Sequence, residues 1–202
     1  MSCYTREQIE SAVKSKGYKW FENGDLNVNI VGVRNDATEG KVTNKFDDCI
    51  TLSYKVDGEW CFECFKCTTD PGDDWMDNPM NRKGTAILVP GQYRGSHKLR
   101  LHQGKYLALG QQKPVKVYRD KNTNGVYDFD EATIQEGLFG INIHRATKYA
   151  GRTSTNIDKW SAGCQVIASN DDWVQFLGIC QAAREEWSNN FTYTLINSND
   201  IA

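Results

Sequence analysis

The chain has 202 residues, enough for one domain that buries roughly 70% of its unfolded surface without disulfide support. Its 24 Lys+Arg and 26 Asp+Glu give a net charge of −2. This balance argues against a nucleic-acid binder or a polybasic membrane binder, because both need clustered cations. No apolar run approaches the ~18 residues that cross a bilayer, so we expect no membrane insertion. We expect residues 1–202 to form one domain and the protein to be a monomer.

The chain begins with a predicted helix. Thr5 and Gln8 fit a capping box, and Ile9 and Val13 share one helical face, so residues 1–24 are expected to be a helical N-terminal appendage.

Most of the remaining elements are predicted strands. Alternating apolar and polar residues predict strands at 26–30, 50–56, 60–67, 85–89, 98–101, 115–118, 140–144 and 191–196. Asp57-Gly58 predicts a hairpin turn between the second and third of these. An apolar stripe from Trp173 to Trp187, capped by Asn170 or Asp171, predicts one further helix. The fold class is therefore mainly β (α+β), with few helices.

Seven cysteines are present, and this odd number fits free thiols. The first residues lack the basic-then-apolar pattern of a secretory signal, so we expect synthesis in a cytosol with reduced thiols. Cys61, Cys64 and Cys67 form C-x-x-C-x-x-C, but alternation along a strand points Cys64 away from the other two. Packing is therefore a better interpretation of these three than a metal site.

Cys164 differs from the other cysteines because it follows a turn of small residues, Ser161-Ala162-Gly163. A glycine before a thiol leaves backbone N–H groups free to bind an oxyanion. His144 ends a predicted strand twenty positions earlier, and the two side chains meet if their strands are neighbours. That pairing would meet the requirement of nucleophilic catalysis. A structural histidine beside an inert cysteine stays open as the alternative.

These residues carry a resemblance to a known family. His144, the sixteen residues 145–160 and then Ser161-Ala162-Gly163-Cys164 resemble the active-site signature of the L,D-transpeptidase (YkuD-type) catalytic domain. The resemblance covers mainly residues 115–180. It implies a β-sandwich of that family's type, with a short N-terminal helix and a C-terminal helix. It also implies that Ser161 orients the imidazole. The stretches around His144 and Cys164 are further similar to a phage-encoded branch of peptidoglycan lysins.

Two positions depart from the family pattern. Ala162 stands where the family has a second histidine, and Val166 stands where it has an arginine that holds a substrate carboxylate. Arg145 or Arg152 could replace that arginine by bidentate carboxylate binding. His102 is a further candidate for lining the substrate cleft.

A second constellation lies at residues 120–131. It fits the calcium loop of an EF-hand, with Gly125 at place 6. The candidate ligands are Asp120, Asn122, Asn124, the Val126 carbonyl, Asp128 and Glu131. We expect a structural Ca²⁺ here and no organic cofactor. The alternative is a connecting turn without an ion, because an EF-hand loop is flanked by helices and residues 115–118 are predicted to form a strand.

The leading hypothesis is a cysteine peptidase, similar to a phage endolysin, that cleaves peptidoglycan peptides through a Cys164 thioester. His144 would take the thiol proton, and the N–H groups of Gly163 and Cys164 would bind the oxyanion. The alternatives are a cross-linking L,D-transpeptidase and a non-catalytic phage structural or wall-binding module on the same fold. The expected site of synthesis is the host cytoplasm, and the expected site of action is the cell wall, in the periplasm or wall space.

Overall fold

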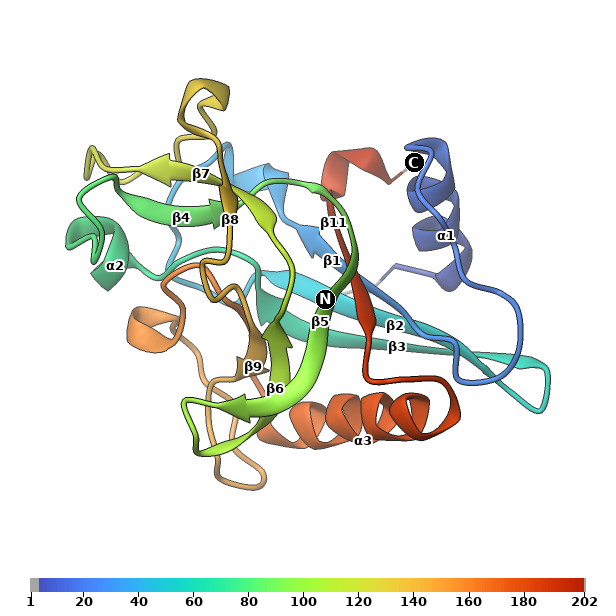
Figure 1. Ribbon diagram of the computed structural model, residues 1–202. Helices are drawn as coiled ribbons and strands as arrows, with labels where there is room; N and C mark the ends of the chain where they lie inside the picture. Colours follow the sequence, from blue (N-terminus) through green and yellow to red (C-terminus); the bar gives the residue numbers. More distant parts are fainter. Residues whose placement is uncertain (1–3, 202) are drawn as a thin grey trace.

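The computed structural model describes residues 4–201 (Figure 1). Eight strands form a closed barrel in the order β1-β11-β5-β6-β9-β10-β3-β2. Their bounds are β1 Asn29–Arg34, β2 Asp48–Val56, β3 Glu59–Thr68, β5 Gly91–His102, β6 Tyr106–Gln111, β9 Ile143–Arg145, β10 Gln165–Ile167 and β11 Phe191–Asn197. A separate sheet has the order β4-β7-β8, with bounds Thr85–Leu88, Val115–Asp120 and Gln135–Gly137. The prediction of a mainly β fold with few helices is confirmed.

The main sheet closes on itself as a barrel and is not specifically the expected β-sandwich. Closure depends on β1, which pairs in parallel with β11 and antiparallel with β2. On the other side, the short strand β10 joins β9 to β3. Both architectures have the same alternation of inward and outward side chains, so the sequence pattern does not distinguish them.

The described part of the chain has three α-helices beside the strands: α1 Arg6–Ser15, α2 Asp73–Asp77 and α3 Asn170–Glu186. The capping box at Thr5 is confirmed, and α1 packs Ile9 and Val13 against the outer face of β1, β2 and β11. Helix α3 runs along the barrel (Figure 1) and buries Trp173 and Phe176 in the main core. Its N-cap is Ser169, one residue before the predicted caps. No helix among the described residues is both long and apolar enough to span a membrane.

The small β4-β7-β8 sheet lies beside the barrel, at the upper left of Figure 1. Leu88 and Val117 on one face join the main core, whereas Ile87 on the other face packs with Met76 of α2 and with Tyr127. The small sheet is thereby fixed between the barrel and the 120–131 loop.

Several strand boundaries differ from the alternation in the sequence. The predicted 26–30 strand is shifted to Asn29–Arg34, since Leu26 has a positive φ of 54° that no regular strand allows. The sequence pattern did not predict strands β6, β8 and β10. The Asp57-Gly58 turn is confirmed, with φ of 51° and 80° as a type I′ turn requires.

The cysteines of β3 alternate as the sequence predicts. Cys61 and Cys67 pack on the main core, and Cys64 packs on the outer face beside α1. Cys64 is disulfide-bonded, so the expectation of free thiols is wrong at this position. Among residues 4–201, the free cysteines are Cys49, Cys61, Cys67, Cys164 and Cys180.

Candidate active site

The two residues of the predicted dyad come from neighbouring strands. β9 and β10 are parallel, and the pairing of His144 with Val166 places Cys164 two residues before that pair. His144 belongs to this pair and Cys164 lies two residues from it. Because side chains alternate along a strand, both point to the same face, the outer face of the barrel. Ile143 and Ile167 point inward to the core. His144 and Cys164 line the same cleft, whose volume is about 980 Å³.

His144 is buried, and its proton position follows from one hydrogen bond. Nδ1 lies 3.0 Å from the carbonyl oxygen of Arg145. A carbonyl can only accept, so Nδ1 carries the proton and Nε2 is the basic nitrogen. Burial, with a smaller contribution from the neighbouring His102, lowers the pKa of His144 to about 4 against the opposing effect of the Arg145 carbonyl. At neutral pH the imidazole is therefore uncharged and available as a base.

Cys164 is half-buried and holds its proton in the resting state. Its Sγ donates to the carbonyl oxygen of Gly140 at 3.3 Å. Burial raises the pKa of the thiol to about 11, while the backbone N–H of Asn142 favours the thiolate. At neutral pH Cys164 is therefore a neutral thiol in the same cleft as the neutral imidazole of His144.

The turn before Cys164 differs in two ways from its predicted role. Ser161 Oγ donates to the Cys164 carbonyl at 2.7 Å and accepts from the Gly163 N–H at 3.1 Å. Ser161 thus holds the turn, whereas the imidazole is oriented by the Arg145 carbonyl. The Gly163 N–H, expected in the oxyanion hole, is occupied by this serine.

The Cys164 N–H remains available as a hydrogen-bond donor, and Gln165 fixes its direction. The buried Gln165 side chain donates from Nε2 to the Gly163 carbonyl at 3.3 Å and accepts from the Tyr193 hydroxyl at 2.7 Å. The C=O and N–H of one trans peptide point in opposite directions, so the Cys164 N–H points away from Gln165. It finds no acceptor among the described residues. Gln165 belongs to the motif, but its role depends on Tyr193, which the sequence places far away.

The cleft around the dyad is cationic and aromatic. Its charged lining residues are Lys105, Arg145, Lys148 and Lys159, and no Asp or Glu of the described residues lines it. Its aromatic lining residues are Trp75, Tyr106, Phe139, Tyr149 and Trp160.

Of the three predicted substrate-binding residues, His102 and Arg145 line this cleft, and Arg152 does not. The Arg145 guanidinium lies 4.4 Å from the Tyr106 ring centroid. Val166, which replaces the family arginine, is fully buried beside Phe46 and Ile157. A carboxylate in the cleft would therefore meet Arg145 and not Arg152.

The predicted calcium loop forms a ladder of local hydrogen bonds. Asp120 accepts from the N–H groups of Asn122 and Asp128, at 3.3 and 2.8 Å. Asn124 accepts from the Val126 N–H at 3.0 Å. The candidate carboxylates Asp120, Asp128 and Glu131 do not all bring an oxygen within 4.8 Å of one another, as they would around a bound calcium ion. The loop has the oxygen donors that calcium prefers, but its side chains are engaged in local hydrogen bonds instead.

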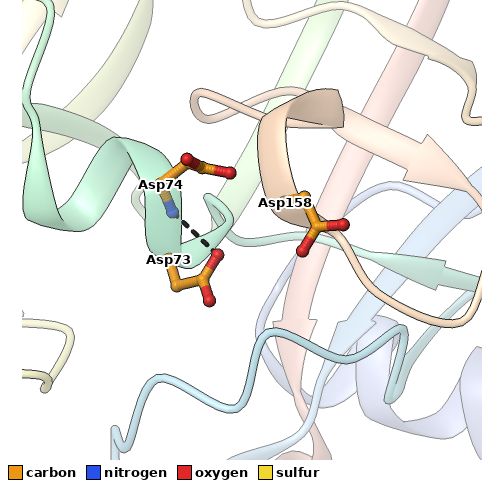
Figure 2. Close-up of side chains that lie close together, drawn as sticks. All are labelled: Asp73, Asp74 and Asp158. Carbon is orange, nitrogen blue, oxygen red and sulfur yellow. Dashed lines mark hydrogen bonds between the residues drawn. The ribbon is translucent and has the colours of Figure 1, made fainter.

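A different group of three carboxylates was not predicted. Asp73 and Asp74 lie at the start of α2, and Asp158 comes from a distant part of the sequence. Carboxylate oxygens of the three residues lie within 4.8 Å of one another (Figure 2). The Asp74 N–H donates to Asp73 at 2.8 Å, and Lys159 Nζ lies 3.9 Å from Asp74. Asp158 is far in sequence from Asp73 and Asp74, so no spacing pattern could have indicated the group.

In comparisons with known protein families, curated proteins and solved structures, none matched this chain.

Proposed function

We propose that this protein is a cysteine peptidase of the phage endolysin type that cleaves stem or cross-bridge peptides of peptidoglycan, on an L,D-transpeptidase-like fold. The observation that carries the proposal is the β9–β10 register, which brings Cys164 and His144 to one face in one cleft. The orientation of His144, with Nδ1 bonded and Nε2 basic, is the one that a general base requires.

The reaction would proceed in two halves. His144 Nε2 takes the Cys164 proton while the sulfur attacks a peptide carbonyl carbon, and the Cys164 N–H stabilises the resulting oxyanion. The C–N bond then breaks, and the leaving amine takes the proton from His144. In the second half His144 removes a proton from water, which attacks the thioester and releases a carboxylic acid. The thiol regains its proton, so the enzyme is restored.

The charge of the cleft favours this substrate class. Peptidoglycan stem peptides carry free carboxylates, and the cleft offers four cations without a lining carboxylate among the described residues. Arg145 is held against Tyr106 and lies 3.4 Å from Asn170 Oδ1, so its guanidinium is oriented before a ligand binds. The proposed place of action is accordingly the bacterial cell wall.

The test is release of new amino groups from purified cell walls. We expect the wild-type protein to release them and Cys164→Ala to release none, with Cys180→Ala as the matched control. Cys180 is a free cysteine buried in α3 that does not line the cleft. Mass spectrometry of digested muropeptides separates cleaved stems from new cross-links. Full activity of Cys164→Ala would refute the proposal, and new cross-links would indicate the transpeptidase.

A wall-binding module without catalysis is the second candidate. The resting hydrogen bond from Cys164 Sγ to the Gly140 carbonyl favours it, because it directs the thiol proton away from His144. Binding of the wild-type protein to walls, without amine release or cross-linking, would establish this function instead.

We also propose a structural Ca²⁺ in the 120–131 loop, held by Asp120, Asn122, Asn124, Asp128 and the Val126 carbonyl. Gly125 has the positive φ, 78°, that the sixth place of such a loop needs. Glu131, at the twelfth place, would supply the last carboxylate of the set. We expect Ca²⁺ to raise the melting temperature of the wild-type protein and not of Asp128→Asn. A melting temperature unaffected by Ca²⁺ and by chelator would refute the site.

A further inference from the structure

Two histidines from distant parts of the chain stack in the cleft. His102 ends β5, and its ring lies 4.4 Å from the His144 ring, centroid to centroid, with an interplanar angle of 27°. The hairpin of β5 and β6 pairs His102 with Tyr106, and the two rings are 5.4 Å apart. The order β5-β6-β9 in the barrel therefore places the His102 imidazole against the His144 ring.

The surrounding hydrogen bonds assign the proton of His102. Asn142 Oδ1 accepts from the Gln111 N–H at 2.9 Å, which fixes the orientation of the Asn142 amide. Its Nδ2 then lies 3.4 Å from His102 Nδ1. An amide nitrogen only donates, so His102 Nδ1 accepts and the proton of the neutral ring is on Nε2. His102 and His144 thus have opposite tautomers. Nε2 carries the proton in His102 and is the basic nitrogen in His144.

Burial and two nearby positive charges keep the His102 ring neutral. Desolvation, Arg100 and Lys105 lower the pKa of His102, in that order of effect. A neutral His102 donates through Nε2–H at neutral pH without competing with His144 for the thiol proton.

The oxyanion site lacks a second donor from its own turn. Such sites hold a developing oxyanion with several donors, and here the Gly163 N–H is bonded to Ser161. Only the Cys164 N–H of the expected pair is free.

We propose that His102 Nε2–H is the second oxyanion donor of this site. The inference rests on the proposed function. His102 donates a hydrogen bond to the substrate oxygen as negative charge develops on it and keeps its own proton throughout. The proton that moves is the Cys164 proton, which passes through His144 to the leaving amine.

The first test is a pair of substitutions with amine release from cell walls as the assay. His102→Phe keeps a ring for stacking and removes the donor, whereas His102→Gln keeps an N–H donor of similar reach. We expect His102→Phe to lower kcat about 10²- to 10³-fold, with KM within about two-fold of wild type. We expect His102→Gln to retain kcat within about ten-fold.

Melting temperatures within a few degrees of wild type are required of both variants. Full kcat in His102→Phe would overturn the proposal, because stacking alone would then suffice. Equal large losses in both folded variants would also overturn it, since a donor in place of the imidazole should restore activity.

The second test does not depend on activity. The chain has three histidines, so long-range ¹H–¹⁵N spectra at neutral pH can be assigned with single substitutions. We expect the Nε2–H tautomer for His102 and the Nδ1–H tautomer for His144. An Nδ1–H tautomer at His102 overturns this inference even in an active protein. The expected tautomers in a protein without any wall-directed activity would refute the proposed function and leave the proton assignment intact.

Discussion

Ser161 Oγ donates a 2.7 Å hydrogen bond to the carbonyl oxygen of Cys164, and thereby closes the turn that presents the thiol. The same hydroxyl accepts from the Gly163 N–H, so a single fully buried side chain satisfies two backbone groups. Cys164 is thus held by hydrogen bonds within its own motif, while the His144 imidazole is oriented by the backbone of β9.

Ser161→Ala should destabilise the protein by about 2 kcal/mol, because it leaves a buried N–H and a buried C=O without their partner. Urea unfolding measures this change in the free energy of unfolding. Ser188→Ala is the control, since Ser188 is exposed, and should change it by less than about 0.5 kcal/mol. Equal stabilities of the two variants would contradict the assigned role of Ser161.

Gly163→Ala should be more destabilising, by about 3 kcal/mol or more. Gly163 has a φ of 118°, and an added Cβ would lie 2.3 Å from the Ala86 carbonyl oxygen, so backbone strain and overpacking both act. Gly178→Ala is the matched control in the exposed face of α3, where an added Cβ meets nothing within 4 Å. It should stabilise the helix by about 0.5–1 kcal/mol. Urea unfolding of both variants checks the contrast, and a tolerated Gly163→Ala would refute it.

Arg145→Lys should raise KM for carboxylate-bearing muropeptides about ten-fold and leave kcat within about two-fold. Lysine keeps the charge but loses the bidentate fork. The rise should disappear on substrates whose carboxylate is amidated. Arg152→Lys is the control, because Arg152 is exposed and does not line the cleft. A KM rise of the same size on both substrates would show that Arg145 does not read the carboxylate.

His97 should make the protein less stable in acid. It is fully buried, and Nε2 donates to the Ile141 carbonyl at 2.8 Å. Burial lowers its pKa to about 4, so the unfolded chain binds a proton between about pH 6.5 and 4 that the folded chain does not. The contribution of neutral His97 to the free energy of unfolding is fully present above about pH 6.5. It decreases as the pH drops, by on the order of 3 kcal/mol.

The measurement is the difference between wild type and His97→Gln in urea unfolding across pH 4 to 7. A difference is needed because burial raises the pKa values of Asp48 and Asp70, which changes stability in the opposite direction over overlapping pH values. The variant should lose less stability on acidification than the wild type. Parallel pH profiles would show that His97 does not titrate as assigned.

Local features of the fold could be predicted from the sequence, because neighbouring residues determine them. The capping box at Thr5, the Asp57-Gly58 turn and the alternation of Cys61, Cys64 and Cys67 across β3 all depend on short-range geometry. The candidate dyad of His144 and Cys164 was also identifiable, since the residue types and their spacing are contained in one segment of the chain.

The tertiary structure alone decided how these pieces close and what surrounds the dyad. Barrel closure depends on the pairing of β1 with β11, and the second imidazole arrives on β5, from outside the motif. The hydrogen bond from the Gly163 N–H to Ser161 Oγ was likewise visible only in the structure. Alternation records which face a residue occupies but carries no information on which strands pair. The sequence by itself therefore determined the chemical groups of this site, and long-range strand pairing determined their partners.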